Sequence, residues 1–419
     1  MENFKKKIKL LLLLFFPIFI FTIIFNSDNL YSDSIEDINI IDQVATSEFP
    51  KGIKFNLSFN SKKTIEDIKL VMNIGNRSVS QYSYMVFSSS KNQIVSEYFH
   101  NAGNINNYIP PSTNITYFYE FIFDDKSSYI SEDFSFFYHD KRFNWQETNT
   151  ENSNVFFYDI PLDLAKEISN ISDQTINDMS RLLNVNIYSA INLVIYNNKN
   201  EMDSAVIHKS KTSSEKLIVL GQAFSDEGVV IVLLDEQILE TVVHEITHIV
   251  SSIATDGSEF LPLWLNEGLS EYSDEFPDKY KSILRWGIEE KNLMPFKHLN
   301  TFPGDPEKTI LAYGQSQSVV RFLINNYGQK NFSELFQQIR FIKSYPEVND
   351  VFTKIYGFNL DELYISWEAD LYNDLGIVSE KNNKSFFDKF FIKNNYYLVL
   401  FFLFALLIFI FIIKKVKKI

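Results

Sequence analysis

Residues 244–248 read His244-Glu245-Ile246-Thr247-His248. This segment is the strongest indication of the fold of the second half of the chain. Its H-E-x-x-H pattern calls for a helix, because there positions i and i+4 share one face. On such a helix both imidazoles can reach one zinc ion, at a typical distance of about 2.0–2.1 Å. Glu245 is then placed to hold a metal-bound water as general base. The segment therefore predicts a helix that carries a zinc site.

The residues around this segment fit the predicted helix. Val229 to Leu234 is a continuous apolar run, which predicts a buried strand. Asp235 follows it and is expected to cap the helix, which should run to about Ile253. Thr241-Val242-Val243 and Ile249-Val250 supply apolar packing positions on either side of the histidines.

A second motif lies further along the chain. Residues 264–271 read Trp-Leu-Asn-Glu-Gly-Leu-Ser-Glu, and 18 residues separate Glu267 from His248. This spacing resembles that of the gluzincin metallopeptidases. Asn266-Glu267-Gly268 is also similar to the context of the glutamate ligand in their aminopeptidase N and leukotriene A4 hydrolase branch. The resemblance implies a peptidase MA-like domain with a thermolysin-like α+β fold at residues 155–375, and Glu267 as the third zinc ligand.

The implied ligand set suits catalytic zinc. Two neutral imidazoles and one carboxylate leave a fourth position open for water, and zinc lowers the pKa of that water to about 7. The resemblance further implies that Glu271 accepts a hydrogen bond from a ligand histidine, whose orientation it would fix. Tyr313, in Ala312-Tyr313-Gly314-Gln315-Ser316, would steady the oxyanion. The alternatives are a solvated surface glutamate for Glu271 and a packed aromatic for Tyr313.

One segment departs from the pattern of the aminopeptidases, which carry a Gly-x-Met-Glu-Asn strand whose glutamate holds the free amine of the substrate. Gly221-Gln222-Ala223-Phe224-Ser225 keeps the glycine and lacks the glutamate. Endopeptidase and aminopeptidase activity therefore both stay open. The backbone of this stretch remains able to pair with an extended peptide by strand addition.

The rest of residues 155–375 predicts a mixed sheet followed by helices. The expected strands are 191–196, 217–220 and 229–234. The further expected helices are 161–183, 264–275, 309–327 and 332–343, with Gly328 ending the third of these.

Residues 46–150 predict an all-β domain. Apolar and polar residues alternate along 53–59, 68–74, 117–123 and 134–138, a period that is typical of half-buried strands. Five to seven short strands in about 100 residues favour an immunoglobulin-like sandwich. His100 and His139 are expected to be ordinary strand or loop histidines without a catalytic role.

Two apolar runs predict a membrane protein. Residues 1–30 combine a basic start with the uncharged run Leu10 to Phe25, as in a signal peptide or an N-terminal anchor. A stalk at 376–395 leads to Tyr396 to Ile413, a predicted transmembrane helix, and then to a basic tail at 414–419. Lysines favour the cytoplasmic side, so the chain between the two runs should lie outside a cell membrane.

The charge and the cysteine content of the chain exclude some classes of binding partner and of metal site. The net charge is −14, and without the eight lysines that flank the runs and Glu2 the remaining 31 basic and 52 acidic residues give −21. Such an acidic body repels phosphate backbones, which argues against nucleic acid. The chain has no cysteine, so disulfides and thiolate metal sites are excluded, and a bacterial source is favoured.

Together these features predict a single-pass, extracytoplasmic zinc metallopeptidase, with peptides or proteins as substrates and the membrane as its other partner. It would hydrolyse peptide bonds with zinc-activated water and Glu245 as general base. The alternatives are a catalytically silent gluzincin-fold sensor or binding protein, and an adhesion protein in which the sandwich matters most. The oligomeric state is left open.

Overall fold

The computed structural model describes residues 37–90, 93–105, 107–206, 220–273, 276 and 278–377. Both predicted apolar runs, Leu10 to Phe25 and Tyr396 to Ile413, lie outside these residues. Among the described helices, none combines the length and the apolar character that crossing a membrane requires. The chain groups into two compact units that divide after residue 253, with residues 178–185 belonging to the second unit.

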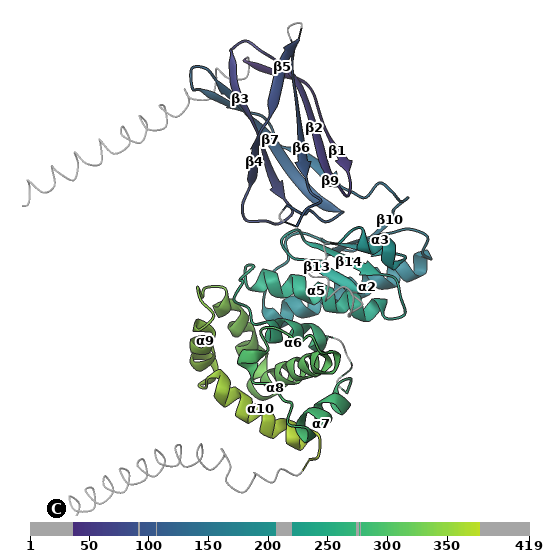
Figure 1. Ribbon diagram of the computed structural model, residues 1–419, viewed down its shortest axis with the longest axis vertical. Coiled ribbons are helices and arrows are strands. Elements are labelled where there is room, and N and C mark those ends of the chain that lie inside the picture. The colour runs from purple at the N-terminus through teal and green to yellow at the C-terminus, as the bar shows by residue number, and fades with distance from the viewer. Residues whose placement is uncertain are drawn as a thin grey trace, which may run out of the picture. The chain divides into compact units, whose positions relative to one another are not determined.

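The first unit begins with two antiparallel sheets (Figure 1). One sheet has the order β1-β2-β6-β5, and the other has the order β4-β3-β7-β8, with β9 also pairing with β7. The strands are β1 (Ile38–Glu48), β2 (Gly52–Ser61), β3 (Ile65–Ile74), β4 (Gln81–Tyr84), β5 (Val86–Ser90), β6 (Gln93–Asn101), β7 (Thr113–Phe123), β8 (Ser128–Ile130) and β9 (Phe134–Tyr138).

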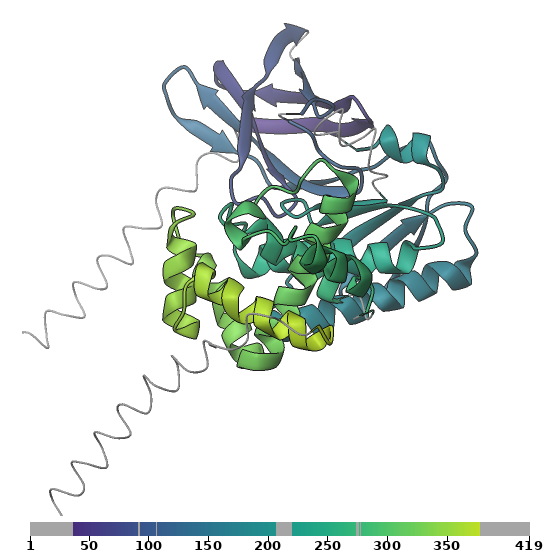
Figure 2. The ribbon, with the colours of Figure 1, turned by 60° about the horizontal axis from the view of Figure 1, so that its bottom comes forward.

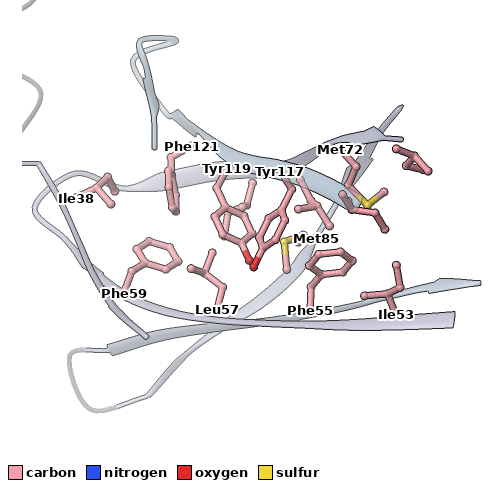
Figure 3. Packing of buried hydrophobic residues seen from close by; sticks show 14 of the residues in the cluster. Ile38, Ile53, Phe55, Leu57, Phe59, Met72, Met85, Tyr117, Tyr119 and Phe121 are labelled. Atoms are coloured by element: carbon pink, nitrogen blue, oxygen red, sulfur yellow. The ribbon is translucent and has the colours of Figure 1, made fainter. Parts of the chain in front are cut away.

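Alternating apolar residues of these sheets form one core, as Figure 3 shows. Aromatic rings meet edge to face across it: Phe55 of β2 lies 5.0 Å from Tyr117 of β7, and Phe59 lies 4.7 Å from Phe121 between ring centroids. Such pairs add to the stabilisation from buried area. The predicted β-sandwich is confirmed, and its four predicted alternating segments correspond to β2, β3, β7 and β9.

A mixed five-stranded sheet follows in the order β10-β11-β12-β14-β13. Its strands are β10 (Gln146–Asn149), β11 (Ser153–Phe157), β12 (Ile191–Tyr196), β13 (Gly221–Phe224) and β14 (Val229–Leu233). β11, β12 and β14 are parallel, and β10 and β13 are antiparallel edges. Every residue of β12 and β14 is buried, as expected for parallel strands covered on both faces. Of the strand expected at 217–220, only Leu220 is described, and it directly precedes β13; residues 217–219 lie outside the described part.

Helices make up the remainder. α2 (Leu162–Leu183), α3 (Lys199–Asp203) and α5 (Ile238–Ala254) accompany the mixed sheet, and the second unit contains α6 (Leu263–Ser273), α7 (Lys281–Glu289), η1 (Phe296–His298), α8 (Pro306–Ile339), α9 (Glu347–Tyr356) and α10 (Leu360–Asp374). α6, α7, α9 and α10 all pack on α8 (Figure 2). Gly328 interrupts α8 with φ 84° and ψ 158°, so the predicted break between two helices is confirmed.

Candidate metal centre

The sequence of α5 explains how its histidines are presented. Val242, Ile246 and Ile249 are fully buried and recur at intervals of three and four residues, so one face of the helix packs into the core. His244 and His248 lie on another face and are half-buried. The predicted cap is close to its expected place, because the Asp235 carboxylate accepts a hydrogen bond of 2.9 Å from the amide of Gln237, next to the first helical residue.

The two imidazoles point at one another. Their Nε2 atoms are 3.2 Å apart, and their ring planes meet at 83°. Two nitrogens bound at about 2.0–2.1 Å to one tetrahedral ion would be about 3.3 Å apart. The observed separation therefore fits two ligands of the same zinc ion.

The structure also brings Glu267 to these histidines. One ligand atom from each of His244, His248 and Glu267 can be chosen so that all three lie within 4.8 Å of one another. Two imidazole nitrogens and one carboxylate oxygen are donors that zinc accepts, so the residues present fit the predicted ion.

Gly268 explains how α6 can carry Glu267 where it does. A Cβ atom at position 268 would lie 2.3 Å from the carbonyl oxygen of Ser316 in α8, a distance that real side chains do not tolerate. The glycine therefore permits a close approach of the two helices right beside the ligand. Gln317 of α8 reinforces it by donating a hydrogen bond of 2.7 Å to the carbonyl oxygen of Glu271. In the sequence Gly268 is visible only as part of the Asn266-Glu267-Gly268 motif, and its packing role becomes apparent only in the fold.

Glu245 lies against the edge strand β13. A Cβ atom at Gly221 would lie 2.6 Å from Cγ and 2.9 Å from Oε1 of Glu245, and 2.8 Å from Cγ2 of Thr241. The absence of a side chain at Gly221 thus gives the carboxylate its space. The sequence showed the glycine, but only the pairing of β13 at the sheet edge places it next to the predicted base.

Glu271 has well-defined partners. Its side chain is 8% exposed, and its Oε2 accepts hydrogen bonds from Lys279 Nζ at 2.9 Å and from Tyr280 Oη at 2.8 Å. This burial disfavours the alternative of a solvated surface glutamate. The hydrogen bond from a ligand histidine stays a prediction. Neither Lys279 nor Tyr280 stood out in the sequence, because both contacts depend on the return of the chain after α6.

Tyr313 lies two turns into α8 rather than at its start. It is half-buried, and its ring meets that of Phe302 edge to face at 4.8 Å between centroids. Its role toward an oxyanion stays a prediction.

His100 lies in β6 of the sandwich, and His139 directly follows β9. Both are far along the chain from the H-E-x-x-H motif. Burial lowers the pKa of both imidazoles, and for His100 the charge of Arg77 adds to this effect. The prediction that they have no catalytic role stays a prediction.

Comparison with known families bears on the second half of the chain. Residues 171–373 match the Peptidase MA superfamily. This range, just under half of the chain, contains α5, α6 and the His-His-Glu group. The chain therefore has a Peptidase MA superfamily domain, which agrees with the resemblance drawn from its motifs. No curated protein matches the chain.

Two solved structures show distant similarity. One is a beta-1,3-glucan binding domain of carbohydrate-binding module family 56, at 18% identity, 24% of this chain, 98% of that chain and a TM-score of 0.16. The other is an aminopeptidase N family protein from Idiomarina loihiensis, at 10% identity, 79% of this chain, 74% of that chain and a TM-score of 0.31. Both TM-scores are low, so neither structure adds to the assignment of the site.

Proposed function

We propose that this protein is a zinc-dependent peptidase of the gluzincin type, with His244, His248 and Glu267 holding the metal ion. The observation that carries the proposal is the convergence of these three side chains on the H-E-x-x-H helix of a Peptidase MA domain. When bound, zinc would polarise the carbonyl of a peptide bond and lower the pKa of a water molecule.

Glu245 is the proposed general base. It lies one residue after His244 and beside the edge strand, and its carboxylate would take a proton from the attacking water and pass it to the leaving amine. Tyr313 would donate a hydrogen bond to the oxyanion of the tetrahedral intermediate. Glu271, which Lys279 and Tyr280 hold in place, would orient a ligand histidine.

Strand β13 is the proposed docking edge for the substrate. Within the described residues it pairs only with β14, so its other edge is free of a described partner strand. An extended peptide adding to this edge would pass close to Glu245, because Gly221 touches that side chain. The missing glutamate of the aminopeptidase motif leaves no equivalent anchor for a free amine in this strand. Cleavage of N-acetylated peptides would identify endopeptidase activity.

The placement of the enzyme is proposed from the sequence. The lysines flanking both apolar runs support a body that lies outside a cell membrane and is held by Tyr396 to Ile413. Residues 10–25 would be either a cleaved signal or a second anchor. The sandwich would be immunoglobulin-like, since its sheets β1-β2-β6-β5 and β4-β3-β7-β9 follow the A-B-E-D and C′-C-F-G strand orders of that fold.

Casein cleavage with metal analysis tests the proposal. We expect one zinc per molecule, cleavage of casein, loss of cleavage on chelation and its return on addition of zinc. Protein that holds zinc but cleaves neither casein nor short peptides would instead indicate a catalytically silent sensor or binding protein. Protein that holds no zinc would remove the metal centre and leave an adhesive role for the sandwich.

A further inference from the structure

A turn of the sandwich lies against a turn of the mixed sheet. Gly75, Asn76 and Arg77 follow strand β3, and Asp226 to Gly228 join β13 to β14. The backbone amide of Asn76 donates a hydrogen bond of 2.7 Å to the carbonyl oxygen of Asp226. We call this pair of segments the turn contact; both belong to the first unit.

A buried ion pair lies at the centre of the turn contact. Arg77 places Nε at 2.6 Å and Nη2 at 2.5 Å from Oε1 of Glu227, and Nη2 also donates to the carbonyl oxygen of Tyr108 at 3.0 Å. The Glu227 side chain is only 7% exposed. Its burial raises the pKa of its carboxyl group, and Arg77 counteracts this shift. A carboxylate this buried depends on its partner, because removing one member leaves an uncompensated charge.

The backbones of both turns are shaped for this approach. Gly75 has φ 56°, and a Cβ atom there would lie 2.5 Å from Cα of Glu227. Gly228 has φ 68°, and a Cβ atom there would lie 2.8 Å from Nδ2 of Asn76. In both turns glycine therefore serves twice, since it adopts the left-handed conformation at little cost and leaves room for the facing segment.

Strand β13 joins the turn contact to the candidate active site. Its last residue, Phe224, packs on the ring of Tyr108 at 5.3 Å between centroids, and its first residue, Gly221, touches Glu245. The strand has four residues, so its ends are only about 10 Å apart at about 3.3 Å per residue. A displacement of the turn would be felt at Gly221, because only the four residues of β13 separate the two.

We propose that the β-sandwich is a positioning element of the active site: the turn contact, through Arg77 and Glu227, holds β13 in the register beside Glu245 that an extended peptide needs. Arg77 is a positioning residue and touches no reacting atom. This inference rests on the proposed function, because it assigns the sandwich a part in substrate binding by the same site. It predicts that the peptidase domain depends on the sandwich for affinity toward peptides.

The test compares Arg77→Ala with Lys69→Ala. Lys69 pairs with Glu120 at 3.0 Å within the sandwich and takes no part in the turn contact, so it is the matched control. Arg77→Ala should raise KM for a peptide about tenfold while kcat stays within about threefold, because β13 supplies ground-state binding. Zinc content should stay at the wild-type value, and Lys69→Ala should leave all three quantities unchanged.

The double variant Arg77→Ala/Glu227→Gln separates the loss of the Arg77 link from the destabilisation that an unpaired buried carboxylate would cause. It removes the uncompensated charge but still lacks the Arg77 link, so the melting temperature should return most of the way to the wild-type value while KM stays raised as in Arg77→Ala. A purely structural role for Arg77 would lower the melting temperature and leave KM of the folded enzyme unchanged. That result would overturn the proposal.

Hydrogen exchange gives a readout that needs no activity. Amides of residues 221–228 should exchange about tenfold faster in Arg77→Ala than in wild type, with no change in Lys69→Ala. Unchanged exchange and unchanged KM in Arg77→Ala would reject the positioning role and leave the proposed peptidase intact. Faster exchange in Arg77→Ala, together with wild-type protein that cleaves no peptide, would reject the peptidase and keep the mechanical link between the sandwich and β13.

Discussion

At the residue scale, we expect His244, His248 and Glu267 to contribute equally to holding the proposed metal ion. Replacing His244, His248 or Glu267 by alanine leaves two donors, and we expect each variant to lose its zinc, as measured by metal analysis of the purified protein. His298→Ala is the matched control, since this exposed histidine of η1 does not belong to the group. Full zinc in all three ligand variants would show that the ion, if any, lies elsewhere.

Gly221 allows a second prediction at this scale. In Gly221→Ala the new methyl group would overlap Cγ of Glu245, so the carboxylate must move. A displacement of about 1 Å in an active site can cost about 10²-fold in rate. We expect kcat to fall on the order of 10–100-fold while zinc content is unchanged. Wild-type kcat in this variant would mean that Glu245 does not act from its position beside β13.

At the element scale, the packing of α6 on α8 determines where Glu267 lies. In Gly268→Ala the helices must separate, since the added Cβ would lie 2.3 Å from a backbone oxygen. Overpacking of this kind typically costs about 1–3 kcal/mol, so thermal unfolding should begin several degrees lower and zinc should bind more weakly. Gly304→Ala is the control, because open space surrounds that position. Equal melting temperatures for the two variants would contradict the close approach.

Strands and helices with strong apolar patterns could be predicted from the sequence, whereas short edge strands and tertiary contacts could not. α5, β12 and β14 were predictable because their apolar patterns are strong, and the sandwich because β2, β3 and β7 alternate over many residues. β13 was not among the expected strands, because it is a short edge strand whose four residues are all half-buried and it therefore has no periodic signal. The grouping of His244, His248 and Glu267 followed from the H-E-x-x-H spacing and from the resemblance to gluzincins. The contacts of Glu271, Gly268 and Arg77 did not, because each joins segments that only the tertiary fold brings together.

At the scale of the whole molecule, the prediction concerns the side of the membrane on which the described domains lie. We expect external protease to digest the described domains in intact spheroplasts, because both lysine clusters favour the cytoplasmic side. Truncation before Lys393 should release a soluble, active enzyme if Leu10 to Phe25 is cleaved, whereas retention in the membrane would identify that run as a second anchor. Protease access to the C-terminal lysines alone would mean an inverted topology.

Casein cleavage by Glu245→Gln is the sharpest test of whether Glu245 is the base of a zinc peptidase. Glutamine keeps the size of the side chain and removes its ability to take a proton. The matched control is Glu240→Gln, which makes the same chemical change in the first turn of the same helix, α5. We predict that Glu245→Gln keeps its zinc and its melting temperature and loses nearly all activity, and that Glu240→Gln keeps both zinc and activity. Near-wild-type cleavage by zinc-loaded Glu245→Gln would mean that Glu245 is not the general base.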